Sequence, residues 1–248
     1  MPIIRYVEEL PDDIKTQMET DLLSYEAKHG IDVNYKLFAL TLKNEHKEVV
    51  GILTAHTAFA EIYLREIWVD ERYQNKGYGR QLLQALEQRY RESGLNNINL
   101  VSCKYQAPDF YLKCGYILEY VRQIPENQKL DLYFFVKFFN DIKKSKIDNL
   151  VNIEHLDVIS TELTKTLETG LKKHEKKHEI DVNYKKFALI LFDDDEKAIG
   201  VLNAFHSYSS IYIEDLYTGN APPGVATLQT AYNNSPAADK SIVLAFQC

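Results

Sequence analysis

The stretch IYLREIWVDERYQNKGYGRQLL, residues 62–83, joins a strand to a helix through a glycine-containing turn. Gln74, Gly77 and Gly79 form the pattern Q-x-x-G-x-G directly after the strand and at the start of the helix. The first turn of a helix presents unpaired N–H groups and favours negative charge. Glycine lets a phosphate approach the backbone, and Lys76 and Arg80 add positive charge. The turn is therefore predicted to bind a phosphate group.

A glycine-containing turn whose basic residues are merely solvated is the alternative interpretation of this loop. The loop is not a P-loop, because no Gly-Lys-Ser/Thr follows it. It also lacks the three-glycine spacing of the dinucleotide fingerprint.

The surrounding sequence predicts an α/β (α+β) domain that is complete by about residue 140. A mixed, mostly antiparallel sheet flanked by helices is expected. Strands are predicted near residues 3–10, 38–42, 51–59, 62–70, 96–103, 115–121 and 129–138. Helices are predicted at 11–30, 81–93 and 107–114, where Leu82, Leu86 and Tyr90 recur at helical spacing.

A second motif, QAPDFYLKCGY, occupies residues 106–116. Together with the Q-x-x-G-x-G turn, it resembles the GNAT superfamily of acetyl-CoA-dependent N-acetyltransferases. In that family a [Q/R]-x-x-G-x-[G/A] loop is followed about 30 residues later by A-x-x-F-Y-x-K-x-G-[F/Y]. The residues that match this second pattern are Ala107, Phe110, Tyr111, Lys113, Gly115 and Tyr116. The resemblance covers residues 1–140 and, more weakly, the repeated part of the second half.

The resemblance implies a GNAT fold that binds acetyl-CoA as cosubstrate and uses no metal. The residues it implies for cofactor binding are Ile67, Trp68, Val69, Gln74, Asn75, Lys76, Gly77, Tyr78, Gly79, Arg80, Ala107, Phe110, Tyr111 and Lys113. The strand edge at 67–69 would pair with the pantetheine amides, and an N–H near Val69 would face the thioester oxygen. Tyr111 would donate a proton to the departing sulfur, with a simple packing role as the alternative.

The general base is less clearly indicated. Family members often carry a carboxylate nine residues before the first Gln or Arg of the loop, and that position is Arg65 here. Glu66 stands beside it, although a displacement of one residue along a strand turns a side chain to the other face. Glu66 is the first candidate for the base, Glu61 is the second, and proton loss through water is the third.

The chain also repeats itself. HGIDVNYKLFAL at residues 29–40 returns as HEIDVNYKKFAL at 178–189, and Tyr35 and Tyr184 lie 149 residues apart (184 − 35). The same shift relates Phe38 to Phe187 and Gly51 to Gly200. A duplicated domain is therefore predicted rather than a short solenoid repeat. The expected division is a complete domain at 1–140 and a partial repeat at 141–248, with a linker around 139–149.

The second copy, 149–217, is predicted to be inactive. Under the shift, Gln74, Gly77 and Gly79 fall on Pro223, Ala226 and Leu228, in a divergent tail at 218–248. Proline offers no N–H group to a phosphate. A degenerate remnant and a frameshift or fused foreign sequence both remain open for this tail. A truncated sheet exposes an apolar face and an edge, so the partial repeat is expected to dock on the first copy, to wall its acceptor cleft, or to pair between chains.

Composition excludes several classes of protein. The 248 residues carry a formal charge of −7, which argues against a nucleic-acid binder. Three cysteines without metal spacing favour a reduced compartment, and no leader or membrane segment is recognised, so a cytoplasmic protein is expected.

The HEKKH of residues 174–178 matches the zinc-protease pattern H-E-x-x-H. We interpret it as a charged helix end.

The sequence thus predicts an acyltransferase that moves the acetyl group of acetyl-CoA to a primary amine by direct attack. The acceptor is a small-molecule or protein amine, and a homodimer is an open possibility. A non-catalytic module that binds acyl-CoA as a regulatory ligand is the alternative, and a scaffold with no active copy is a third.

Overall fold

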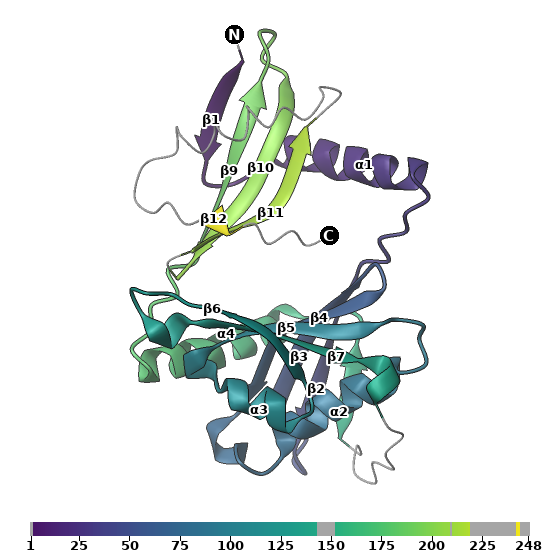
Figure 1. The fold of residues 1–248 in the computed structure, drawn as a ribbon, viewed down its shortest axis with the longest axis vertical. Coiled ribbons are helices and arrows are strands. Elements are labelled where there is room, and N and C mark those ends of the chain that lie inside the picture. The colour runs from purple at the N-terminus through teal and green to yellow at the C-terminus, as the bar shows by residue number, and fades with distance from the viewer. Residues whose placement is uncertain (1, 143–151, 209, 219–241, 244–248) are drawn as a thin grey trace. The chain divides into compact units, whose positions relative to one another are not determined.

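The computed structural model describes residues 2–142, 152–208, 210–218 and 242–243. The chain divides into two compact units. We call residues 33–180 the central unit, and residues 1–32 with 181–248 the split unit. Each is built on one sheet, with several helical segments in the central unit and helix α1 (Asp12–Lys28) in the described part of the split unit (Figure 1). Among the described helices, none is long and apolar enough to cross a membrane.

The central unit contains a seven-stranded sheet in the order β6-β7-β5-β4-β3-β2-β8. Its strands are β2 (Lys36–Lys43), β3 (Val49–Ala58), β4 (Glu61–Val69), β5 (Asn97–Cys103), β6 (Ile117–Arg122), β7 (Leu132–Phe138) and β8 (Ile153–Leu156). Its α-helices are α2 (Tyr78–Tyr90), α3 (Pro108–Lys113) and α4 (Thr161–Lys177). Only β4 and β5 run parallel among these paired strands. The predicted mixed, mostly antiparallel sheet with flanking helices is confirmed.

The split unit contains a five-stranded sheet in the order β1-β9-β10-β11-β12. Its strands are β1 (Ile3–Val7), β9 (Lys185–Phe192), β10 (Ala198–Ser207), β11 (Ser210–Thr218) and β12 (Ile242–Val243). Helix α1 (Asp12–Lys28) belongs to the same unit. Strand β12 runs parallel to β11, and the other pairs are antiparallel.

The units do not follow the division at residue 140 that the sequence suggests. The first strand and helix of the chain, β1 and α1, join the sheet of the second half, where β1 pairs with β9. In their place, β8 and α4 complete the sheet of the first half, where β8 pairs with β2. A sheet formed by 36–138 therefore takes its last edge strand and one covering helix from beyond residue 140.

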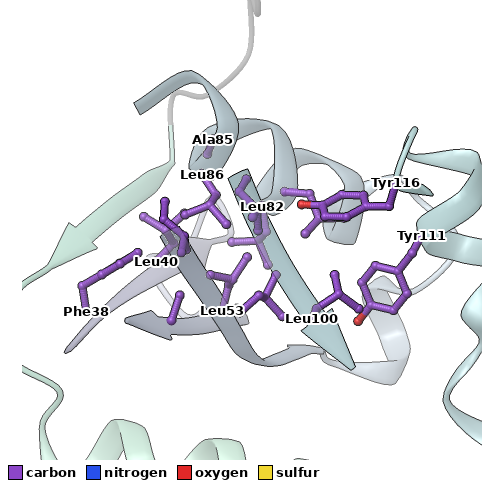
Figure 2. Close-up of a cluster of buried hydrophobic side chains, with 14 of the residues drawn as sticks. Phe38, Leu40, Leu53, Leu82, Ala85, Leu86, Leu100, Tyr111 and Tyr116 are labelled. Atoms are coloured by element: carbon purple, nitrogen blue, oxygen red, sulfur yellow. The ribbon is translucent and has the colours of Figure 1, made fainter. Parts of the chain in front are cut away.

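Two apolar layers enclose the sheet of the central unit. Phe38, Leu40 and Leu42 of β2 face a core that includes Leu82 and Leu86 of α2, as Figure 2 shows for several of them. The intervening Ala39 faces the opposite layer. That layer joins Ala39, Ile52, Leu163 and Leu167, with Trp68 packed against it. Strand β2 alternates as predicted, but both of its faces are buried because α2 and α4 cover opposite sides.

Strand β4 contains a bulge that resets its alternation. Thr54 of β3 lies opposite Glu66, whereas the next residue, Ala55, lies opposite Leu64, so Arg65 is the additional residue. Such a bulge changes which face the following side chains take. Leu64 before the bulge and Ile67 after it both pack on the α2 side.

Part of the expected linker at 139–149 belongs to the fold. Phe139 and Ile142 are buried in the same core as α2. Residues 143–149 of that segment, and most of the divergent tail at 218–248, lie outside the described residues.

Candidate active site

The candidate site begins where β4 and β5 part. Their parallel pairing covers only Glu61–Tyr63 against Asn97–Asn99. Beyond that point β4 continues to Val69 along β3, and β5 continues to Cys103 along β7. Two strands that diverge in this way leave backbone N–H and C=O groups on their facing edges for another extended molecule.

Val69 and Ile67 present those groups to the open edge of β4. The N–H of Asp70 donates to Val50 of β3 at 2.9 Å. Successive residues of an antiparallel strand direct their backbone groups to alternate edges, so the groups of Val69 and Ile67 point away from β3. Those of Trp68 point toward β3. Of the three residues predicted to pair with pantetheine, Trp68 is the one whose backbone the sheet already uses.

The Trp68 side chain lies on the face covered by α4. It packs with the layer formed by Ile52, Leu163 and Leu167. Gly170 of α4 is so close that a Cβ atom there would clash with the indole ring at its nitrogen edge. Trp68 therefore contributes to the packing of α4 rather than to a cofactor surface.

The turn after β4 is fixed by its own residues. The Gln74 amide donates to the Val69 carbonyl at 3.0 Å, which ties the loop to the end of the strand. Asn75 and Gly77 both adopt positive φ, at 60° and 84°. A Cβ atom on Gly77 would meet nothing within 4 Å, so open space adjoins the backbone there.

Helix α2 begins directly after Gly77. Its first intrahelical bond runs from the Gln81 N–H to the Gly77 carbonyl at 3.0 Å. The N–H groups of Tyr78, Gly79 and Arg80 precede that bond and have no intrahelical acceptor. No acidic residue occupies the first turn of α2, and Gly77 has no side chain with which to cap it. These three N–H groups and the helix dipole make a position that could hold an anion.

The two glycines of the loop have different roles. Gly77 permits the positive φ beside open space, as the phosphate prediction requires. A Cβ atom on Gly79 would stand 3.2 Å from the Phe110 ring, so this glycine permits close packing of α3 on α2. Arg80 also joins the two helices by donating to the Lys113 carbonyl at 3.3 Å.

Further predicted cofactor residues border the same turn. The Lys76 ammonium lies 5.1 Å from the centre of the Tyr73 ring, and that ring lies 5.9 Å from Tyr78. Ala107 adopts a positive φ of 72° at the start of α3. The structure thus brings together the loop, the start of α2 and α3.

Tyr111 of α3 lies inside the core of the central unit. Its ring contacts Phe110 and Phe135, at centroid distances of 5.2 and 5.5 Å, and lies beside Leu100 of β5 (Figure 2). Burial raises the pKa of the Tyr111 phenol, and neighbouring Cys114 adds to the shift. The phenol is therefore protonated at neutral pH and able to act as a donor.

Glu66 lies on the face opposite Tyr111. It accepts a hydrogen bond from the hydroxyl of Thr54, which is buried on β3. Glu66 and Trp68 share a face because they are two residues apart beyond the bulge, and α4 packs over that face at Trp68. Arg65, at the position where the family often has a carboxylate, is the exposed bulge residue.

A second carboxylate, that of Glu61, lies in the short stretch where β4 and β5 are still paired. Glu61 accepts from the Tyr63 hydroxyl and from the Asn99 amide, both at 2.7 Å. It therefore joins the last paired residues of β4 and β5. The geometry favours a structural role for Glu61.

His56 is buried on the same face of the sheet as Glu66, and the sequence did not point to it. It is 5% exposed, and its ring lies between Tyr35 and Tyr63 at 5.0 and 5.2 Å. Burial, with a smaller contribution from Arg65, lowers its pKa to about 4. Its position two residues after Thr54 on one strand was a usable signal, because alternate residues share a face.

The HEKKH stretch lies at the end of α4, as the sequence reasoning proposed. His174 and His178 pack their rings on Tyr105 at 5.9 and 5.8 Å. Within the described ranges, no group of three or more His, Cys, Asp or Glu side chains could hold a metal ion.

Comparison with known proteins identifies one family. Residues 5–116 match the model of the "Acetyltransferase (GNAT) family", so this part of the chain carries a GNAT acetyltransferase domain. No curated protein matches the chain.

Several solved structures are similar. An acetyltransferase from Bacillus cereus ATCC 14579 has 27% identity and a TM-score of 0.46, and the match covers 54% of this chain and 97% of that one. The ribosomal-protein-S18-alanine N-acetyltransferase from Escherichia coli has 17% identity and a TM-score of 0.37, with coverage of 59% and 99%. A chimera of the spermidine N-acetyltransferase SpeG from Vibrio cholerae and hSSAT has 16% identity and a TM-score of 0.36, with coverage of 56% and 96%.

Proposed function

We propose that the central unit transfers the acetyl group of acetyl-CoA to a primary amine by direct attack. One observation carries the proposal. The parallel pairing of β4 and β5 ends at Tyr63 and Asn99, and the freed edge of β4 leads straight to the start of α2. An extended pantetheine and a pyrophosphate require these two features in this order.

The residues present fit the cofactor. The N–H groups of Tyr78, Gly79 and Arg80 would hold the pyrophosphate, with Lys76 adding charge. The outward backbone groups of Ile67 would pair with a pantetheine amide. The outward N–H of Val69 stays available for the thioester, whereas the Val69 carbonyl already accepts from Gln74. Acetyl-CoA supplies an activated acyl group there, and the protein supplies orientation, hydrogen-bond donors and proton transfer.

The chemistry then needs three groups of this chain. The N–H of Val69 would donate to the thioester oxygen as negative charge develops on it, and loss of one such donor typically costs roughly 100- to 1000-fold in rate. A C–N bond forms and the C–S bond breaks. Glu66 would accept the proton that the amine loses, and Tyr111 would give its proton to the departing sulfur.

The Thr54–Glu66 hydrogen bond supports a second candidate function. Because that carboxylate already has a partner within the sheet, it is less available as a base. The central unit would then bind acyl-CoA as a regulatory ligand without turnover. Release of CoA thiol in the presence of an amine separates the two functions.

We further propose that strands β9, β10 and β11 belong to a degenerate copy that binds no CoA. Pro223, Ala226 and Leu228 stand where the repeat would require Gln74, Gly77 and Gly79. Leu228 would add a side chain where the central unit has none, and Pro223 has no N–H group.

The direct test is calorimetric titration with acetyl-CoA, followed by a thiol-release assay across small amines and peptide amines. Gly77→Asp should weaken acetyl-CoA binding at least roughly tenfold, because a carboxylate would enter the space beside the anion position. Gly94→Asp is the matched control, since Gly94 has φ of +85° and equal open space but lies beyond the far end of α2. Absence of binding by the wild type, or an equal loss in both variants, would contradict the proposal.

A further inference from the structure

The two sheets take their first strand from opposite halves of the chain in the same register. Val7 of β1 lies opposite Ala188 of β9, and Leu156 of β8 lies opposite Ala39 of β2. The 149-residue shift relates Val7 to Leu156 and Ala39 to Ala188. Each half therefore gives its strand and helix to the other half.

We propose that this exchange is specified by side chains, so that β8 and α4 are the dedicated complement of the 36–138 sheet. The second half of the chain then exists in part to complete the first. Exchange alone would not show this, because two identical strand–helix segments could be traded without consequence. The segments are not identical, and they differ where they touch the sheets.

The first difference is a reversal of charge on the strands. Arg5 of β1 pairs with Glu196 at 2.9 Å and stacks over Phe192 at 4.5 Å. Its equivalent on β8 is Glu154, which pairs with Lys43 at 2.6 Å. Each charge thus meets an opposite charge or an aromatic ring in the sheet that it joins.

An unexchanged chain would lose both contacts. Arg5 would lie beside Lys43 and near Lys47, the equivalents of Phe192 and Glu196. Glu154 would lie beside the apolar Phe192 and near Glu196. Two attractions would become two repulsions, which is how charge patterns exclude a wrong partner.

The second difference is the shape of the helices. In the central unit the Trp68 indole lies so close to Gly170 that a Cβ atom there would clash with it. In the split unit the equivalent residues are Tyr217 and Asp21, and the Tyr217 hydroxyl donates to the Asp21 carboxylate. A glycine therefore accompanies the large ring, and a carboxylate accompanies the hydroxyl.

Trading the helices would disturb both pairs. Asp21 would bring a side chain into the indole of Trp68, which would have to move. Gly170 would leave the Tyr217 hydroxyl without its carboxylate. The charge reversal on the strands and the shape match on the helices therefore favour the same assembly independently.

A third set of contacts ties α4 to the site loop of the central unit. Lys173 and Lys177 reach Glu71, directly after β4, at 2.7 and 3.6 Å. The α1 equivalent of Lys173 is Ser24, which carries no charge. The chain passes between units after Asp32 and after Ile180. Both positions lie inside the repeated stretch at 29–40 and 178–189. This repeated stretch is therefore where the two strand–helix segments change partners.

Paired cysteines in the full chain test which strands are neighbours. The Lys43 N–H donates to the Asn152 carbonyl at 3.0 Å, and Ile3 lies opposite Phe192. Neighbours on antiparallel strands are within the span of a disulfide. K43C/N152C and I3C/F192C should therefore cross-link on mild oxidation of dilute protein, whereas K43C/I3C and N152C/F192C should not.

Peptide mass spectrometry would separate these links from any that involve the native cysteines, and a non-reducing gel would show whether they lie within one chain. Links within single chains in the first two variants alone are the expected result. Linking in the last two variants, or linking of the first two only between chains, would overturn the proposal. None of these readouts depends on acetyl transfer.

A charge exchange tests whether the side chains specify the assembly. R5E/E154R should lower the Tm of the full chain by roughly 2–4 °C, because both charges would then face their own sign. E8D/D157E trades two equivalent acidic residues and is the matched control, expected to leave the Tm unchanged. A Tm of R5E/E154R equal to or above that of the wild type would overturn the proposal.

Discussion

Strands β2, β3 and β4 of the central unit and strands β9, β10 and β11 of the split unit form nearly the same structure. Their bounds differ by the 149-residue shift throughout. The bulge between Thr54 and Ala55 recurs between Asn203 and Ala204. The Thr54–Glu66 hydrogen bond also has a counterpart, from the Asn203 amide to Asp215 at 2.9 Å.

The two sets of strands differ in the segment that comes next along the chain. After β4 come Gln74, Gly77 and Gly79 and helix α2, whereas the shifted positions after β11 hold Pro223, Ala226 and Leu228. A bulged strand with a bonded carboxylate is therefore a property of the scaffold that both units share. The anion position and the Tyr111 phenol are the features that the central unit adds.

Loss of the Tyr111 hydroxyl should give the largest effect, because it belongs to the part that only the central unit has. Tyr111→Phe is expected to lower kcat by roughly 100- to 10,000-fold with little change in the affinity for acetyl-CoA. Tyr116→Phe is the matched control. Its hydroxyl is buried without a hydrogen-bond partner, so its removal should be harmless. Equal kcat values for Tyr111→Phe and the wild type would refute the role of Tyr111 as the acid.

The two bonded carboxylates give the sharpest test of the comparison between units. Glu66→Gln should lower kcat by about 100-fold if Glu66 is the base. Asp215→Asn changes the equivalent residue of the split unit and should leave kcat unchanged. Steady-state CoA release at saturating acetyl-CoA measures both. Full activity of Glu66→Gln would mean that the amine loses its proton through water. Glu66 would then have only a structural role, like Asp215.

The equivalent residues His56 and Phe205 should make the stability of the two units depend differently on pH. Both rings lie between two tyrosines, but only His56 titrates. Its folded pKa of about 4 lies below the unfolded value of 6.5, so stability present above pH 6.5 falls as the pH drops toward 4. The fall from this residue approaches about 1.4 kcal/mol per pH unit within that window.

Chemical unfolding at several pH values measures this effect. His56→Phe copies the residue of the split unit and should flatten the profile between pH 6.5 and 4. Phe205→Leu changes the equivalent ring of the split unit and should lower stability equally at every pH. An unchanged acid profile in His56→Phe would show that His56 is not held neutral.

Gly170→Ala should give a smaller effect whose sign is informative. Alanine inside a helix normally stabilises relative to glycine by roughly 0.5–1 kcal/mol. Here the new Cβ would meet the Trp68 ring, so overpacking should destabilise the protein by about 1–3 kcal/mol. Asp21→Ala on α1 should instead lose the hydrogen bonds from Tyr217 and Gln17 without any overpacking. Stabilisation by Gly170→Ala would mean that α4 does not pack on Trp68.

Much of the central unit could be predicted from local pattern. The alternation of Phe38, Leu40 and Leu42 and the helical spacing of Leu82 and Leu86 lie where the structure has β2 and α2. The loop glycines pointed to the start of α2 for the same local reason, because positive φ and close helix contact both require glycine.

The exchange of strands and helices could not be predicted in that way. Helices α1 and α4 bury equivalent residues, Met18 and Leu167. Helical spacing indicates that such a residue will be covered, and it does not show which sheet will cover it. That choice depends on contacts between residues far apart in sequence, such as Gly170 with Trp68.

The faces of β4 were also beyond simple alternation. Strict alternation places Leu64 and Ile67 on opposite faces, but the bulge at Arg65 brings both to the α2 side. For the same reason Trp68 turns its side chain to α4 and its backbone to β3, and only Ile67 and Val69 remain for a cofactor. A bulge inside an otherwise regular strand leaves little trace in the sequence.

The number of acetyl-CoA molecules bound per chain tests the central claim most directly. Calorimetric titration of the full chain should give one site per chain, and Gly77→Asp should weaken that site while Ala226→Asp does not. This result would place the site in the central unit and show that the strands of the split unit are scaffold alone. Two sites per chain, none, or a site weakened by Ala226→Asp and not by Gly77→Asp would contradict the account.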